Sequence, residues 1–135
     1  MTSDRTSTQV RRWQRAENLV IAAAIVIAMV AWGQPWWLLI AAVLVFDLSA
    51  LGYLVNPRVG AFGYNLVHNY TSPAALVVVW AALQLGGLRT DWLVVVAACW
   101  AFHVAVDRAL GYGLKLGSFQ HTHLGAIGKA RGGAR

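Results

Sequence analysis

Four long apolar segments, separated by short polar turns, make up most of the chain. They cover approximately residues 16–32, 36–54, 60–85 and 92–110. Each has about 17 to 25 residues, the length that an α-helix needs to cross the hydrocarbon core of a bilayer. The turns carry residues that end helices: Gly33-Gln34-Pro35, Asn56-Pro57-Arg58 and Gly86-Gly87. Because short connections join antiparallel helices, the pattern predicts an all-α integral membrane protein, an antiparallel bundle of four transmembrane helices.

Polar segments at both ends lie outside this pattern. We expect residues 1–12 to form a mobile basic tail, residues 13–128 to form the four-helix domain with a cytoplasmic C-terminal extension, and residues 129–135 to form a second basic tail. The first apolar segment has no small-residue cleavage site before Trp32, so we expect it to be retained and not removed as a secretory signal. Within the third segment, Pro73 is expected to bend the helix.

Composition supports a membrane protein, and the distribution of charge predicts its orientation. Of the 135 residues, 59% are hydrophobic and only 12% are charged, which is too apolar for an ordinary soluble domain. The net charge of +6 does not indicate nucleic-acid binding, because the basic residues flank apolar segments and form no run with interleaved aromatics. Ten of the eleven Lys and Arg residues fall on the side of the termini, and only Arg89 falls on the other. The positive-inside rule then places both termini in the cytoplasm.

Ionisable side chains interrupt the apolar segments at a common depth. His103 and Asp107 are four residues apart, so on a helix they share a face with Cβ atoms about 6 Å apart. Asp47, His68 and His103 each lie roughly 10–12 Å from the cytoplasmic end of their segment, counted at 1.5 Å per residue. An unpaired charge at the centre of a membrane helix costs roughly 3 kcal/mol or more. We therefore expect these groups to meet in a functional site.

Carboxylates and imidazoles presented at one level of a helical bundle favour a divalent transition metal such as Zn, Fe or Mn. The candidate ligands are Glu17, Asp47, His68, His103, Asp107 and His123, and the candidate catalytic residues are Asp47, His68, His103 and Asp107. A bound metal would support hydrolysis or oxidation of a lipid-like substrate. Hydrogen bonds that orient ligands or substrate are expected from Tyr64, Asn65 and Asn69. A phosphate or carboxylate head group is expected to be received by Arg58, Arg108 and Lys115.

Other interpretations of the same residues remain open. The polar side chains can form a hydrogen-bond network that serves only folding or partner binding. His68 and His103 can be the axial ligands of a haem, although the nearby Asp47 and Asp107 disfavour it because haem prefers an apolar wall. The cations Arg58, Arg108 and Lys115 can act only as topology anchors in contact with membrane lipid. A proton relay is poorly supported, since the outer half of the segments is almost wholly apolar.

Several longer motifs resemble those of a known family. They are Phe46-Asp47-Leu-Ser-Ala-Leu-Gly-Tyr53, Asn56-Pro57-Arg58-Val-Gly60-Ala, Tyr64-Asn65-Leu-Val-His68-Asn69-Tyr70, His103-x-x-x-Asp107-Arg108-x-x-Gly-Tyr-Gly-Leu-Lys115 and Thr122-His123-Leu-Gly125. From about Arg15 to Gly128 the chain resembles the bacterial family catalogued as domain of unknown function 4260. The resemblance implies a small multi-spanning protein of the bacterial cytoplasmic (inner) membrane and supplies no reaction. His121 stands where that pattern leads us to expect a more acidic residue.

Overall fold

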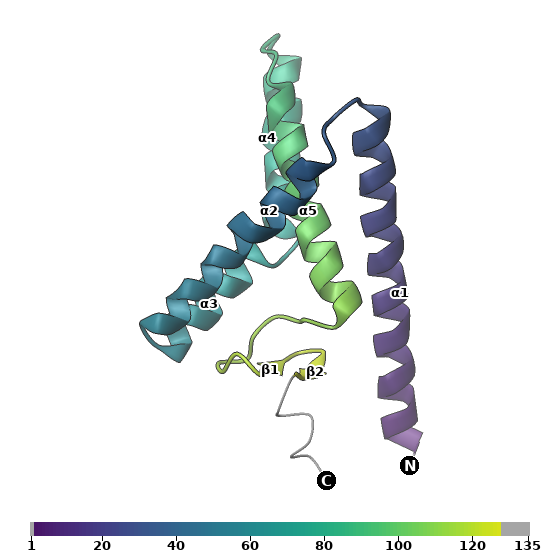
Figure 1. Ribbon diagram of the computed structural model, residues 1–135, viewed down its shortest axis with the longest axis vertical. Coiled ribbons are helices and arrows are strands. Elements are labelled where there is room, and N and C mark those ends of the chain that lie inside the picture. Colours follow the sequence, from purple (N-terminus) through teal and green to yellow (C-terminus); the bar gives the residue numbers. More distant parts are fainter. Residues whose placement is uncertain (1, 128–135) are drawn as a thin grey trace.

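The long helix α5 (Asp91–Leu110) runs through the middle of the structure and contacts α1 (Thr2–Ala31), α2 (Trp37–Asp47) and α4 (Thr71–Leu85) (Figure 1). The computed structural model describes residues 2–127, with side chains from Ser7 onward. Between α2 and α4 the chain forms the 3₁₀-helix η1 (Leu48–Leu54) and the helix α3 (Pro57–Val67). After α5 it forms a small hairpin of β1 (His121–Thr122) and β2 (Gly125–Ala126). The fold is otherwise helical, as the sequence predicts.

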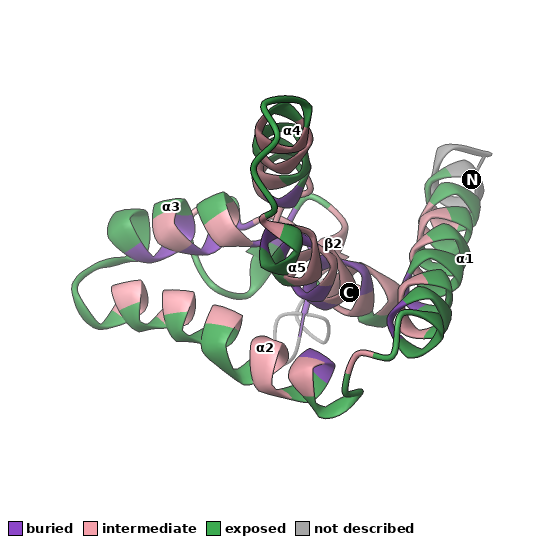
Figure 2. Ribbon diagram, turned by 90° about the horizontal axis from the view of Figure 1, so that it is seen from above, coloured by how far each residue is buried: buried purple, intermediate pink, exposed green. Residues whose placement is uncertain are grey.

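Three helical segments are long and apolar enough to cross a membrane: Ser7–Ala31, Trp37–Leu54 and Asp91–Leu110. A fourth crossing arises only if α3 and α4 form one span, and these two helices are bent by 42° at a short break. Large apolar side chains cover the outer surface, with Ile27 69%, Leu44 67% and Val78 68% exposed. Buried residues lie where the helices face one another (Figure 2). An apolar surface of this extent is unusual in water, so the chain has the features of a membrane protein.

The ends of two expected segments differ from the sequence analysis. α1 begins at Thr2 and so includes the residues assigned to an N-terminal tail. The third segment is divided at residues 68–70, and Pro73 lies within the first turn of α4 and not at the bend. Proline fits there because the first N–H groups of a helix have no intrahelical acceptor. The tail expected at residues 129–135 lies outside the described residues.

Small residues let η1 and α3 approach each other backbone to backbone. A Cβ atom on Gly52 would lie 3.2 Å from Cα of Gly60, and a Cβ atom on Gly60 would overlap the ring of Tyr53. The side chain of Asn56 accepts a hydrogen bond from the Val59 N–H group (2.9 Å) and so begins α3. The resulting hairpin extends away from α5 and returns to it at the end of α3 (Figure 1).

The segment after α5 folds back against α3. Gly111, with φ 96°, ends α5 in the left-handed conformation that favours glycine. The Asn65 side chain then accepts from the Lys115 N–H group (2.6 Å) and donates to the Lys115 carbonyl (2.9 Å). The Asn65 amide therefore makes the same pair of hydrogen bonds that a residue of a neighbouring strand would make. These two bonds fix the start of the C-terminal segment against α3.

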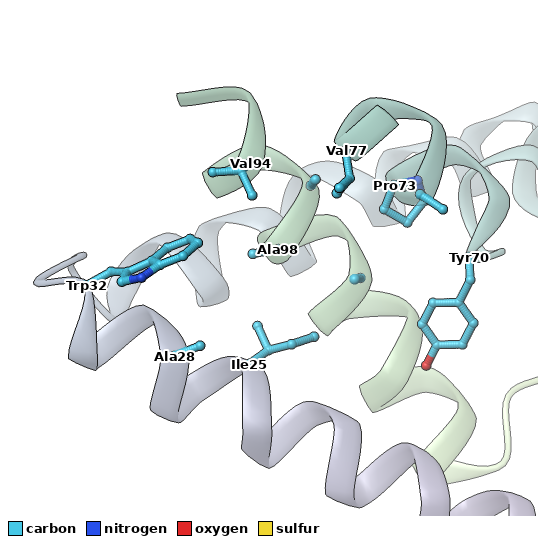
Figure 3. A pocket seen from close by; sticks show the side chains of 11 residues that line it. Ile25, Ala28, Trp32, Tyr70, Pro73, Val77, Val94 and Ala98 are labelled. Carbon is cyan, nitrogen blue, oxygen red and sulfur yellow. The ribbon is translucent and has the colours of Figure 1, made fainter. Parts of the chain in front are cut away.

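An apolar groove lies between α1, α4 and α5, with Trp32 and Tyr70 toward its two ends (Figure 3). Its volume is about 310 Å³, and Ala97, Ala98 and Ala101 line it on α5. At about 100° per residue, these alanines lie on the opposite side of α5 from His103. The groove is therefore separate from the polar residues described next.

Candidate metal centre

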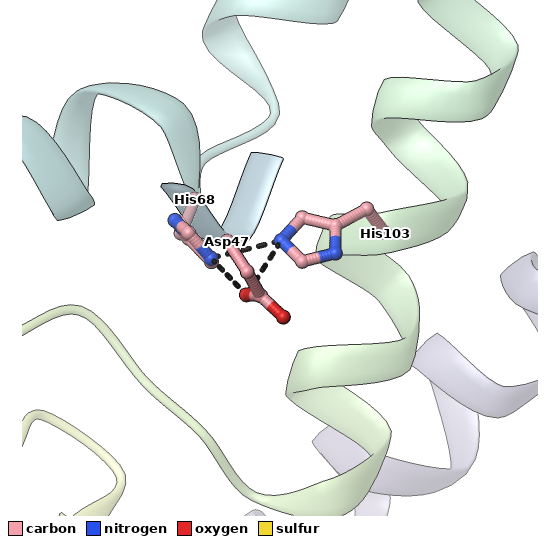
Figure 4. A group of neighbouring side chains, drawn as sticks. All are labelled: Asp47, His68 and His103. Atoms are coloured by element: carbon pink, nitrogen blue, oxygen red, sulfur yellow. Dashed lines mark hydrogen bonds and ion pairs between the residues drawn. The ribbon is translucent and has the colours of Figure 1, made fainter. Parts of the chain in front are cut away.

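Three polar side chains from separate elements converge beside α5 (Figure 4). Asp47 ends α2, His68 follows the last residue of α3, and His103 lies within α5. The Nε2 atoms of His68 and His103 are 2.8 Å apart, and Oδ1 of Asp47 lies 3.5 Å and 3.7 Å from them, respectively. One ligand atom from each residue lies within 4.8 Å of the others. The expectation that these three residues meet closely enough to hold a metal ion is confirmed.

The two imidazoles are enclosed, whereas the carboxylate is not. The side chains of His68 and His103 are 2% and 1% exposed, and that of Asp47 is 55% exposed. The group is therefore closed on the side of α5 and open on the side of Asp47. An ion held here would have free coordination positions only on that open side.

The neighbours of His68 determine which of its nitrogens carries hydrogen. Its Nδ1 lies 2.9 Å from the carbonyl oxygen of Tyr64, which can only accept a hydrogen bond. Nδ1 is thus protonated in the neutral ring, and the lone pair of Nε2 points into the group. The 2.8 Å contact between the imidazoles then requires His103 to donate from Nε2. This is the same pair of nitrogens that a metal ion would bind in place of the hydrogen.

Asp107 lies at the edge of the three-residue group. Its Oδ2 is 3.5 Å from Nε2 of His68 and accepts a hydrogen bond of 2.7 Å from the Tyr64 hydroxyl. The Tyr64 ring also stacks on the His68 ring, with centroids 3.6 Å apart. Tyr64 therefore holds both a candidate ligand and the carboxylate next to it, which is the role that outer residues play around metal ions.

The break between α3 and α4 leaves backbone carbonyl groups that a continuous helix would pair. Four of them are paired instead with side chains: Asn65 O with Asn69 Nδ2 (2.6 Å), Leu66 O with Ser72 Oγ (2.9 Å), Val67 O with Trp100 Nε1 (2.6 Å) and His68 O with Arg108 Nη2 (3.1 Å). The Tyr64 carbonyl keeps its helical bond from the His68 N–H group (2.8 Å) and also contacts His68 Nδ1 (2.9 Å). An unpaired carbonyl in an apolar layer costs several kcal/mol. These side chains therefore allow the helix to end beside the group and to place His68 there.

Two predicted orienting residues bind the backbone. Asn65 and Asn69, which we expected to orient ligands or substrate, instead hold Lys115 and the break between the helices. Asn69 also accepts from the Thr71 N–H group (2.8 Å), at the start of α4. Their positions close to His68 in the sequence reflect this structural role.

Lys115 is buried, with only 3% of its surface exposed. Its Nζ atom has no hydrogen-bond acceptor among the described residues. It lies 4.4 Å from the ring centroid of Tyr64 and 3.9 Å from that of Phe119. Burial lowers the pKa of Lys115 to about 8, and the negative charge of Asp107 opposes this shift.

The other two predicted cations lie in different surroundings. Arg108 is partly buried, donates to the His68 carbonyl through Nη2 and contacts His123 Nε2 through Nη1 at 2.9 Å. Arg58 is exposed in the first turn of α3. Of the three cations, Lys115 is the one whose charged group is both enclosed and without a hydrogen-bond acceptor in the described part of the chain.

Two expected metal ligands lie apart from the three-residue group. Glu17 is exposed on α1, and His123 follows β1. The Nδ1 atom of His123 accepts from the Leu114 N–H group (2.8 Å), and burial together with the adjacent Arg108 lowers the pKa of this histidine. His121 is also exposed and contacts Ser118 Oγ at 2.7 Å. These residues were predicted only because they lie on the same side of the membrane as the group, and this does not fix the direction in which a side chain points.

Two aromatic residues at the site were not predicted from the sequence. Trp100 bonds the Val67 carbonyl and stacks on Phe46, with ring centroids 4.9 Å apart. Phe119 covers Lys115. A signal for Trp100 was present, because an indole in the middle of an apolar helix needs an acceptor for its N–H group. No pattern in the sequence distinguishes Phe119 from other aromatic residues near the membrane surface.

The distances within the group are those expected of metal ligands. Two atoms about 2.1 Å from one ion are about 3.0 Å apart at a right angle and about 3.4 Å apart at a tetrahedral angle. The observed separations of 2.8, 3.5 and 3.7 Å span these values. Two imidazoles and one carboxylate with open positions on one side are the ligand set typical of non-haem Fe(II) centres.

Comparison with known proteins gives a family and no activity. No curated protein and no solved structure matches the chain. One family model, described as a domain of unknown function (DUF4260), matches residues 11–127. These residues include α1 from residue 11 onward, all the later helices, the group of Asp47, His68 and His103, and the C-terminal hairpin. Because the match covers most of its 135 residues, the chain belongs to the DUF4260 family.

Proposed function

We propose that this chain is a membrane-embedded metalloprotein in which Asp47, His68 and His103 hold one divalent transition metal ion. The observation that carries the proposal is the approach of three ligand atoms, from three elements, to within 4.8 Å of one another. The 2.8 Å separation of the two imidazoles corresponds to a ligand angle near 90°, and the 3.5 and 3.7 Å separations from Asp47 correspond to tetrahedral or wider angles, so the proposal covers Fe(II), Mn(II) and Zn(II).

The site would serve an enzyme that acts on a lipid-like substrate. A metal ion bound here would activate water for hydrolysis or support an oxidation at its open positions. The exposed side of Asp47 provides access for the substrate, and the buried imidazoles keep the opposite side dry. Asp107, held by Tyr64 next to His68, is placed to accept a proton from a group bound at the centre.

The same proposal includes four crossings of the cytoplasmic membrane, with α3 and α4 forming one broken span and both termini in the cytoplasm. Its support is the charge distribution, because ten of the eleven Lys and Arg residues fall on one side under this topology. The start of α1 and the β1–β2 hairpin lie at the same end of the molecule (Figure 1), as an even number of crossings requires.

A structural network is the competing function, because contacts such as those between Tyr64 and Asp107 and between His68 and His103 form without an ion.

The test is the metal content and metal affinity of the purified full chain, given Fe(II), Mn(II) or Zn(II) in turn. We expect one ion per chain, and a loss of affinity in Asp47→Asn and His103→Gln larger than the roughly 10- to 100-fold effect of outer residues. His121→Gln, at an exposed histidine, is the matched control and should retain the ion.

Each other result has a defined meaning. A chain that binds no ion, or in which His121→Gln lowers affinity as much as His103→Gln, would contradict the metal centre. If the ion is absent and His103→Gln also lowers the unfolding temperature, the residues serve folding. A haem absorption band that disappears in His68→Ala and also in His103→Ala would show that the protein is a cytochrome and would overturn the proposal.

A further inference from the structure

We propose that the ammonium group of Lys115 is the anion-binding element of this centre, and that the ligand of the centre carries a phosphate group. The inference rests on the metal ion of the proposed function and names the class of its substrate. Four observations carry it: the unpartnered ammonium group, its position across the Tyr64 ring from His68, the balance of charge, and the pairing of the other nearby cation.

The ammonium group of Lys115 is buried with all of its hydrogen-bonding capacity unused. An ammonium group has three N–H donors and no acceptor, and Nζ finds no acceptor in the described part of the chain. The rings of Tyr64 and Phe119 attract its charge through their faces. They do not replace the directed oxygen acceptors that a buried cation requires. Phosphate oxygens would supply them.

Lys115 is one aromatic ring away from the metal ligands. His68 stacks on one face of Tyr64 at 3.6 Å, so Nζ of Lys115, 4.4 Å from the same centroid, lies over the opposite face. The Tyr64 hydroxyl points to Asp107, whose negative charge also acts on Lys115. The flexible four-carbon stem of lysine allows the ammonium group to move around the edge of the Tyr64 ring toward a ligand.

The charges around the centre balance only without a metal. Asp47 and Asp107 contribute two negative charges, and Arg108 and Lys115 contribute two positive charges. A divalent ion therefore leaves an excess of about two positive charges in a site that is open only on the side of Asp47, and such an excess attracts an anion. The dianion of a phosphate monoester matches it in charge.

Arg108, the other cation beside the centre, is already paired. Its Nη2 binds the His68 carbonyl and its Nη1 contacts His123. Phe119, in contrast, is the exposed part of the cover over Lys115, with 45% of its surface accessible. Displacement of this one ring would open Lys115 to the ligand while the break between α3 and α4 stays intact.

The test uses the full chain in maltoside micelles, loaded with Mn²⁺, which accelerates the relaxation of ³¹P nuclei near it. The probes are inorganic phosphate, short-chain phosphatidic acid, and phosphatidylcholine with the same acyl chains. We expect a saturable acceleration for phosphatidic acid and none for phosphatidylcholine, whose phosphodiester group is screened by choline. A response to phosphatidic acid alone identifies a lipid ligand, and an equal response to inorganic phosphate identifies the free anion.

Variants separate Lys115 from the general charge of the surface. Lys115→Met should weaken phosphate binding at least about tenfold, as the loss of a charge-assisted hydrogen bond implies, and should leave Mn²⁺ affinity within about twofold. Lys115→Arg keeps the charge and should restore part of the binding. Arg58→Met removes an equal charge from an exposed position and should have little effect.

The two proposals fail in different ways. A chain that binds no Mn²⁺ overturns both the centre and the inference. A chain that binds Mn²⁺ but shows no saturable ³¹P effect overturns the inference alone. Equal phosphate binding by the wild type and Lys115→Met, or an equal loss in Arg58→Met, also overturns it.

Discussion

The hydroxyl group of Tyr64 links the carboxylate of Asp107 to the imidazole of His68, and its removal should lower metal affinity. Tyr64→Phe deletes the 2.7 Å hydrogen bond to Asp107 and keeps the ring that stacks on His68. Asp107 is only 17% exposed, so water replaces the lost donor poorly. A hydrogen bond to such a charged group contributes about 1.5–3 kcal/mol.

Because this hydrogen bond also forms without the ion, only the part of its energy that is gained when the metal binds changes the affinity. At about 1.4 kcal/mol for each factor of ten, the whole bond sets an upper limit of about 100-fold, and we expect a loss of about tenfold or more in the association constant for the metal. The same range describes outer residues that orient ligands in other metal centres. The assay is a competition titration of the ion between the purified protein and a chelating dye.

The matched control is Tyr70→Phe. Tyr70 also donates its hydroxyl hydrogen to a side-chain oxygen, that of Asn18 on α1, and it lies away from the three-residue group. We expect its metal affinity to stay within about twofold of the wild type. An unchanged affinity in Tyr64→Phe, or a loss of the same size in Tyr70→Phe, would refute the reasoning, since the effect would then be absent or would not depend on Asp107.

Three further predictions concern packing, the C-terminal segment and pH. Gly60→Ala should be less stable than Gly63→Ala by about 1–3 kcal/mol in thermal unfolding. A Cβ atom at Gly60 overlaps the ring of Tyr53, whereas at Gly63 the nearest atom is 3.6 Å away. Equal stabilities would contradict the close backbone contact of η1 and α3. Asn65→Ala removes both bonds to the Lys115 backbone, about 1–3 kcal/mol together, and should speed amide exchange in residues 112–127; unchanged exchange would exclude this anchor. Burial lowers the pKa of Lys115 to about 8, so the positive charge of Lys115 is lost as the pH rises through this value. The ratio of phosphate affinities between the wild type and Lys115→Met should therefore fall about tenfold between pH 7 and pH 9. A ratio that stays constant would show that the charge is not involved.

The apolar helices and the three residues that converge could be predicted, because both depend on the length and hydropathy of segments and on positions counted along them. Segment length and hydropathy identify the spans, and a charged residue within an apolar segment is conspicuous. Counting residues from the same side of the membrane gave Asp47, His68 and His103 one depth, and these three do meet. Depth was enough here because α2, α3 and α5 all reach the same level.

The remaining features depend on tertiary contacts that no local pattern contains. The sequence predicts the third segment as one helix bent at Pro73, yet the helix ends at His68. It can end there because side chains on α4 and α5 donate hydrogen bonds to its free carbonyl groups. The sequence predicts Lys115 at the membrane surface, as a head-group binder or a topology anchor. In the structure, Asn65 binds its backbone next to α3 and Phe119 covers its charged group. Glu17 and His123 were expected on the same side of the membrane as the group, but both are exposed and lie outside it.

The break between α3 and α4 also determines how this region can move. Its carbonyl groups are bonded to residues on α4, on α5 and in the break itself. A rotation of α4 against α3 would disrupt these bonds together, and under the proposed topology, with α3 and α4 as one broken span, water could not restore them. The junction between α3 and α4 should therefore open cooperatively and not bend gradually. His68 is then either in its place beside His103 or displaced together with the whole turn.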